Sequence, residues 1–235
     1  TRNGLIDEAP SKTEDIRNYP RLRLQITKNG NNTDPTSALT VPTSFPAGTT
    51  FEIYQWSDGA YNYIAPYAKV AWSTTKSSFV DVETDEFPVL EMDEVNDGKF
   101  AVKEITATPG YILDTEIKYV DISDAVSSEV YRTVNFVNNP NYFEVQKKDA
   151  DGNNLKIPAT FTFRNESTGA EYSVTTDSST GLARIYRLTP GNWTYRETAV
   201  PSTYALDGNQ YSIFVDSDSL ITTDTETSVE HARAS

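Results

Sequence analysis

The 235-residue chain contains no cysteine and only one histidine, His231. Without thiols it can form no disulfide, thiolate nucleophile, thioester or cysteine-based metal site. A single histidine nearly excludes a Ser-His-Asp triad or a multi-histidine metal site. We therefore predict no cofactor, no metal and no conventional hydrolase. Only a cleft with two accessible carboxylates would reopen the last of these possibilities.

The chain also lacks a long apolar run and has few basic residues. It has 20 Lys and Arg but 34 Asp and Glu, which gives a formal net charge of −14. Such an acidic chain is a poor ligand for nucleic acid and anionic membranes, and its simplest explanation is solubility. No segment is long enough to span a membrane, and no signal peptide is evident. We expect any secretion or anchoring segments to have been removed from this sequence.

Aromatic residues are plentiful, with 14 Tyr, 10 Phe and 3 Trp in a chain that is 37% hydrophobic. This composition can bury a substantial core. Short stretches alternate apolar and polar residues, and Gly, Pro, Asn and Asp separate them, whereas no convincing helix is present. The loop 31–46 is rich in Thr, Ser, Asn and Pro. The pattern predicts an all-β chain built of β-sandwich modules.

Two of the expected strands carry a glutamate on their apolar side. Glu197 continues the alternation of Trp193 and Tyr195, and Glu104 does so in the segment 100–104. Side chains two apart share one face of a strand, so both carboxyl groups are predicted to point into a core. A buried carboxylate without a partner is costly. Both glutamates therefore need an explanation.

The two strands belong to an internal repeat. The order of elements from residue 20 onward recurs from residue 141 onward, and the first copy carries an insertion at about 57–85. We predict an N-terminal arm or linker at 1–17, a first domain at 18–140 and a second domain at 141–235, for which truncation at the C-terminus stays an open alternative. The linker at 139–142 is very short, which predicts a semi-rigid pair.

Each copy also places a lysine on the apolar face of its first strand, Lys28 in one and Lys147 in the other. Asn138 has the same orientation at the end of the last strand of the first copy. The simple explanation is that these polar groups lie at the rim and reach water. Their recurrence in the same order favours a chemical role.

That role follows from burial. A desolvated lysine loses its proton readily and becomes a nucleophile, while a protonated buried glutamate can polarise an amide and shuttle protons. Attack of the amine on an asparagine amide, with loss of ammonia, would leave a permanent Lys–Asn bond. The fold would supply the proximity that such a single-turnover reaction needs. The bond would also replace the missing disulfides.

These residues resemble the CnaB-type domains of Gram-positive surface adhesins and pilins. That family carries a glutamate strand of the form Tyr-x-Leu-x-Glu-Thr-x-Ala-Pro-x-Gly-Tyr. The segment 193–204 (WTYRETAVPSTY) matches it closely except for Thr203 at the glycine, and the segment 100–111 (FAVKEITATPGY) matches it more loosely. The family's lysine before an Asp-x-x-Gly turn occurs at Lys147, and its Asn-x-Pro ending occurs at Asn138.

The resemblance implies two tandem transthyretin-like (Ig-like) β-sandwich domains with autocatalytic isopeptide bonds. By position, Lys28 would join Asn138 with Glu104 assisting, and Lys147 would be the nucleophile of the second domain with Glu197 assisting. The final run 228–235 offers no Asn or Asp as acceptor. Either the acceptor lies beyond Ser235 or the second bond has been lost, and Asp216 and Asp224 are weaker candidates.

The resemblance also implies a structural or adhesive role at a Gram-positive cell wall or fimbrium. Other pilus subunits or a host surface ligand would be the partners, without nucleic acid and without membrane insertion by this fragment. The alternative is a module that binds a host protein or glycan through an aromatic patch on the first domain. The residues of this patch, which lie on or beside the insertion, are Trp56, Tyr61, Tyr63, Tyr67 and Trp72. The simpler explanation is that they form the core of an enlarged first domain.

Overall fold

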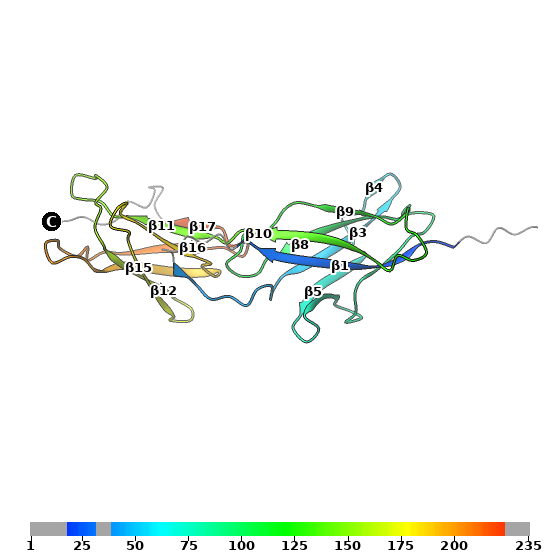
Figure 1. Cartoon of the computed structure of the whole chain (residues 1–235), viewed down its shortest axis with the longest axis horizontal. Helices are drawn as coiled ribbons and strands as arrows, with labels where there is room; N and C mark the ends of the chain where they lie inside the picture. The colour runs from blue at the N-terminus through cyan, green and yellow to red at the C-terminus, as the bar shows by residue number, and fades with distance from the viewer. Residues whose placement is uncertain (1–17, 32–38, 224–235) are drawn as a thin grey trace, which may run out of the picture.

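The computed structural model describes residues 18–31 and 39–223, and these residues form strands, turns and loops without a helix. None of them builds a helix long and apolar enough to cross a membrane. Two β-rich lobes lie end to end along the long axis of the molecule (Figure 1). The predicted all-β class is therefore confirmed. The first lobe contains β1 (Arg21–Gly30), β3 (Thr50–Ser57), β4 (Ala60–Tyr61), β5 (Ala68–Ser73), β6 (Ser78–Asp81), β7 (Val89–Glu91), β8 (Lys99–Thr106), β9 (Lys118–Asp121) and β10 (Tyr131–Asn138).

The second lobe is built mostly from the later part of the chain. Its strands are β11 (Tyr142–Gln146), β12 (Thr160–Asn165), β13 (Glu171–Thr175), β14 (Leu182–Tyr186), β15 (Gly191–Ala199), β16 (Gln210–Val215) and β17 (Ile221–Thr223), joined by β2 (Leu39–Thr40) from the early part.

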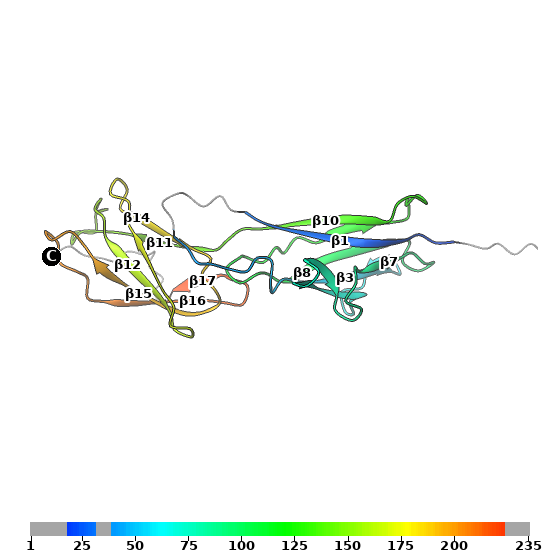
Figure 2. The same ribbon diagram turned by 60° about the horizontal axis from the view of Figure 1, so that its bottom comes forward.

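Two sheets face each other in the first lobe. One sheet has the order β10-β1-β7, and the other contains β6-β5-β3-β8-β9 with β4 paired to β3. Turning the molecule shows β1 and β10 in one layer and β3 and β8 in the other (Figure 2). Strand β1 alternates exposed and buried residues over its first six positions, as its sequence predicts. Leu22, Leu24 and Ile26 thereby enter a core that also holds Phe51 and Phe136.

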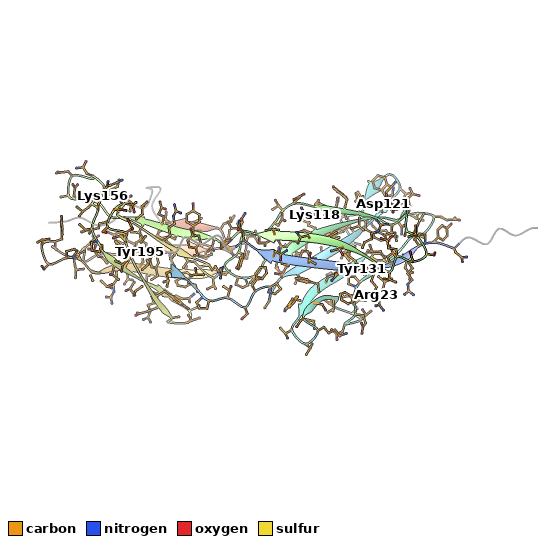
Figure 3. All side chains as sticks on the ribbon, in the orientation of Figure 1. Arg23, Lys118, Asp121, Tyr131, Lys156 and Tyr195 are labelled. Atoms are coloured by element: carbon orange, nitrogen blue, oxygen red, sulfur yellow. The ribbon has the colours of Figure 1, made fainter. Side chains whose placement is uncertain are left out.

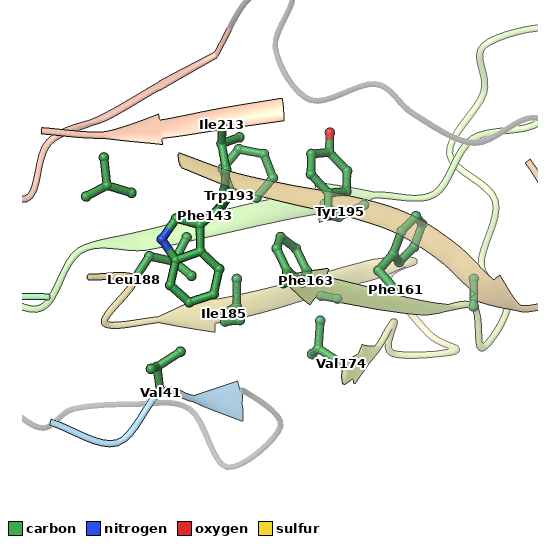
Figure 4. Close-up of a cluster of buried hydrophobic side chains, with 14 residues drawn as sticks. Val41, Phe143, Phe161, Phe163, Val174, Ile185, Leu188, Trp193, Tyr195 and Ile213 are labelled. Carbon is green, nitrogen blue, oxygen red and sulfur yellow. The ribbon is translucent and has the colours of Figure 1, made fainter. Parts of the chain in front are cut away.

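The second lobe repeats this plan with one difference. Its larger sheet has the order β13-β12-β15-β16-β17, and its smaller sheet has the order β11-β14-β2. Apolar side chains from both sheets, including Phe143, Phe163 and Trp193, fill the space between them (Figure 4). In the first lobe the whole length of β10 pairs in parallel with β1. Among the described residues no strand flanks β11 in the same way, and the strand expected at 227–231 lies outside them.

The insertion predicted at about 57–85 contains β4, β5 and β6. Strand β5 pairs with β3 as β13 pairs with β12, so this part of the stretch has a counterpart in the second copy. The loop predicted at 31–46 contains β2, which was not expected as a strand. The predicted domain boundaries at 17 and 140 remain predictions.

Candidate crosslink sites

Lys28, Glu104 and Asn138 meet inside the first lobe. They come from β1, β8 and the last position of β10, and the parallel pairing of β1 with β10 brings the lysine and the asparagine to the same end of the sheet. Lys28 Nζ lies 2.6 Å from Glu104 Oε1, and both side chains are fully buried. Lys28 Nζ also donates a short hydrogen bond to Asn138 Oδ1. The structure thus brings together all three residues predicted for this site.

The environment of Lys28 disfavours its charged form. Burial lowers the pKa of the Lys28 ammonium below its usual 10.5, and the hydrogen bond and charge of Glu104, followed by the charge of Asp114, oppose this effect. The ammonium lies 5.7 Å from the ring centroid of Phe51 and 5.6 Å from that of Phe136. Desolvation by such apolar walls favours the neutral amine.

Glu104 is held from three sides. Its Oε2 accepts the backbone N–H of Asp114 at 2.8 Å, and Asn138 Nδ2 donates to Oε1 at 3.2 Å and to Oε2 at 3.1 Å. The carboxyl group therefore touches both the amine and the nitrogen that an amide exchange would release. Asn138 turns its carbonyl oxygen toward Lys28 and its amide nitrogen toward Glu104. This arrangement suits amide formation with proton transfer through one carboxyl group.

The second lobe repeats two of the three members. Lys147 Nζ lies 2.7 Å from Glu197 Oε1, again with both side chains fully buried. Glu197 Oε2 accepts the backbone N–H of Asp207 at 2.8 Å, which repeats the contact between Glu104 and Asp114. The glutamates also sit at matching register positions, opposite Phe51 and Phe161, next to a register shift in each sheet.

An acceptor is missing from this second constellation within the described residues. Besides its ion pair with Glu197, the Lys147 ammonium has no hydrogen-bond partner there. Asp216 uses its Oδ1 to accept the backbone N–H groups of Asp218 and Leu220 in its own turn. Asp224 and the run 228–235 lie outside the described residues.

Sequence reasoning missed the two backbone donors. Asp114 and Asp207 act through their N–H groups, each ten residues after the glutamate it serves. The equal spacing in both repeats was a visible signal, but nothing in the side chains pointed to a main-chain contact. Within 18–31 and 39–223, no cluster of three or more His, Cys, Asp and Glu is placed to hold a metal ion.

The predicted aromatic patch divides into two groups. Trp72 packs against the first core, 5.2 Å from the ring of Phe79, while Tyr67 packs at 5.2 Å from Phe100. Trp56, Tyr61 and Tyr63 form a second group at the β3–β4 hairpin. Tyr119 on β9 joins this group with its ring 5.0 Å from that of Tyr61, although no sequence pattern pointed to it.

The second group faces outward. Tyr63 is 44% exposed and Tyr119 is 61% exposed, while Trp56 and Tyr61 are half-buried. Trp56 and Tyr61 pair across the hairpin with ring centroids 5.1 Å apart, and Lys99 Nζ lies 5.2 Å from the Trp56 ring. We call Trp56, Tyr61, Tyr63 and Tyr119 the hairpin aromatic cluster. Lys118 and Asp121, at the two ends of β9, lie along the upper side of the first lobe in this view (Figure 3).

Comparison with solved structures finds chains that are similar to parts of this one. The chain is similar to the Bacillus anthracis TIE protein, with 24% identity, a TM-score of 0.41 and coverage of 85% of this chain and 32% of that chain. It is also similar to a C-terminal fragment of the pilus adhesin SpaC from Lactobacillus rhamnosus GG, with 15% identity, a TM-score of 0.46 and coverage of 87% and 86%.

A third similar structure is the pilus adhesin RrgA from Streptococcus pneumoniae, with 24% identity and a TM-score of 0.34, over 37% of this chain and 10% of that chain. The chain thus spans about a third of the TIE chain and a tenth of the RrgA chain. A search of curated proteins found no match.

The comparison with family models gives a match to each half of the chain. The model described as the SpaA prealbumin-like fold domain matches residues 46–135 and again residues 141–229. Together these matches cover well over half of the sequence. Prealbumin is another name for transthyretin, so the predicted fold of two tandem transthyretin-like domains is confirmed. The chain belongs to the SpaA prealbumin-like fold domain family and contains two copies of that domain.

Proposed function

We propose that this chain is a structural and adhesive module of a Gram-positive cell-surface protein or pilus subunit, located at the cell wall or fimbrium. In this proposal an autocatalytic bond between Lys28 and Asn138 stiffens the first repeat. Family membership supports the structural role. The observation that carries the bond is the buried contact of Lys28 with both Glu104 and Asn138. Other pilus subunits or a host surface ligand are the proposed partners.

The reaction needs only groups already in contact. Transfer of a proton from Lys28 Nζ to Glu104 converts the ion pair to a neutral amine and a neutral carboxyl group. The amine attacks Cγ of Asn138, and Glu104 relays protons from Nζ to Nδ2, which leaves as ammonia. One C–N bond forms and one C–N bond breaks, so no co-reactant is required. The carboxyl group ends in the protonation state in which the exchange began.

The intact mass of the purified chain tests this proposal. We expect the first repeat to be one ammonia lighter than its sequence requires, and a peptide joining Lys28 to Asn138 after digestion. Glu104→Gln and Asn138→Ala should restore the full mass, because each removes a reacting or proton-relaying group. Glu197→Gln is the matched control and should keep the loss. An unmodified mass for the unaltered protein would refute the bond.

The same measurement reports on the second repeat. Lys147 and Glu197 are in place, but the described residues supply no asparagine to them. We therefore expect the loss of one ammonia and not two. A further loss of one water would instead identify an aspartate acceptor, and digestion would show whether Asp216 or Asp224 is the residue joined.

A second candidate function is ligand binding through the hairpin aromatic cluster. The observation in its favour is the exposure of Tyr63 and Tyr119 beside half-buried rings. Monomeric proteins usually bury such groups or use them for contact. The test is binding to a glycan array and to immobilised extracellular-matrix proteins. We expect the double variant Tyr63→Ala/Tyr119→Ala to bind more weakly than the unaltered protein. Phe214→Ala, an exposed aromatic residue of the second repeat, is the control. Equal binding by both variants would dismiss the cluster as the contact surface.

A further inference from the structure

The small sheet of the second lobe contains a strand that the first repeat supplies. Strand β2 pairs in parallel with β14, with Leu39 opposite Ile185 and Thr40 opposite Tyr186. The backbone N–H of Val41 extends this pairing by donating to Tyr186 O at 3.0 Å. In the close-up, Val41 follows β2 and points toward Ile185 and Leu188 (Figure 4).

The side chains of this segment complete the second core. Val41 is only 3% exposed and belongs to the cluster that contains Ile185, Leu188 and Trp193, and Leu39 packs against the same cluster. Thr40 lies between them. The period of two places both apolar residues on the inner face of an added strand. The segment thus behaves as a member of the second sandwich, although it belongs to the first repeat by sequence.

The edge of β14 would be incomplete without this segment. An unpaired strand edge exposes backbone groups and the apolar side chains beneath it, and proteins normally cover such edges. The two family matches cover residues 46–135 and 141–229, so Leu39–Val41 lies outside both. The segment therefore packs in the sheet of the second lobe without belonging to the family match of that repeat.

We propose that the outer edge of β14 is a docking site for an extended segment with apolar residues at alternate positions, and that Leu39–Val41 is its resident occupant. The second repeat then reaches its full stability only with a strand donated by the first. The two repeats are coupled through this strand, independently of whether the bond between Lys28 and Asn138 forms.

Hydrogen exchange on the full chain with the Val41→Ala substitution tests the proposal. Removing buried methyl groups from the donated strand should raise amide exchange in β14 and β13 by about tenfold or more, because their opening becomes easier. Exchange in β3 and β8 of the first repeat should stay unchanged. Val41→Asp should give a larger rise, and Val41→Ala remains informative if that variant fails to fold.

Val70→Ala is the matched control, because Val70 is a fully buried valine of the first core. It should raise exchange in the first repeat and leave β14 protected. The proposal is overturned if Val41→Ala leaves exchange in β14 and β13 unchanged, or if its effect is confined to the first repeat as for Val70→Ala. Intact mass, measured on the same samples, reports separately on the proposed bond between Lys28 and Asn138.

Discussion

Glu104 and Glu197 show how a fold positions a buried carboxyl group. In each, a backbone N–H holds one oxygen and a buried lysine contacts the other. The lysines and glutamates could be predicted from sequence, because strand alternation alone decides which side chains face a core. The two backbone donors could not, since a main-chain N–H has no sequence signature. Asn138 was predictable because β10 continues the alternation to its last residue and because Asn138-Asn-Pro140 resembles the family's Asn-x-Pro ending.

The lowered pKa of Lys28 predicts a pH dependence in a variant that cannot form the bond. In Asn138→Ala the unfolded chain binds more protons at this lysine than the folded chain does, between the lowered pKa and 10.5. Stability should therefore rise as the pH increases through that window. The measurement is urea unfolding of the first repeat at several pH values.

Lys28→Met/Asn138→Ala is the reference for that series, because it lacks the titrating group and retains the others. Tyrosines with raised pKa values, such as Tyr54 at about 12, act in the opposite direction in both variants and cancel in the difference. If the difference in unfolding free energy between the two variants does not change with pH, burial leaves the pKa of Lys28 unshifted.

At the scale of elements, the junction between the repeats depends on a loop after β8. Gly110 has a φ of 87°, and a Cβ at this position would lie 2.8 Å from the carbonyl oxygen of Arg187. Its N–H donates to Ser219 Oγ, and its carbonyl oxygen accepts the N–H of Asn141. The next residue, Tyr111, is buried beneath Arg187. In the second copy the position that corresponds to Gly110 is occupied by Thr203, which is exposed.

Gly110→Ala should therefore destabilise the protein more than a substitution at a glycine with free space. Gly59 is the matched control, since its φ of 85° is nearly the same but no atom lies near its missing Cβ. We expect Gly59→Ala to cost about 1 kcal/mol from backbone strain alone. The excess for Gly110→Ala measures the contact with Arg187, and thermal unfolding of both variants reports it. An equal loss of stability in both variants would mean that Arg187 moves away from the added methyl group at no cost.

Most elements could be predicted from sequence because their alternation is long. Strand β2 could not, for physical reasons. It is two residues long, lies in a stretch rich in Thr, Ser, Asn and Pro, and pairs with a strand of the other repeat. The local alternation of apolar and polar residues does not predict pairing with a strand so distant in sequence.

At the scale of the whole molecule, the proposed bond closes a very long loop. Lys28 and Asn138 are 110 positions apart. By the chain-entropy model, a crosslink of about this span removes roughly 5 kcal/mol of unfolded-state freedom. Asn138→Ala should lower the stability of the first repeat by an amount of that order, as measured by calorimetry. Glu197→Gln should leave that transition unchanged, and a comparable fall in both would contradict the assignment.

The parallel pairing of β1 and β10 also decides how a pulling force would travel. The chain enters the first lobe along β1, contributes β2 to the second lobe, returns at β3, and finally leaves the first lobe after β10, toward β11. With Lys28 joined to Asn138, tension between β1 and the linker would pass directly across the bond, and the chain between these two residues would not be extended. About 360–400 Å of extended chain, for a span of 110 positions, would then not be released by the stretching force. The first lobe would then transmit tension as a short covalent link and would not lengthen by unfolding.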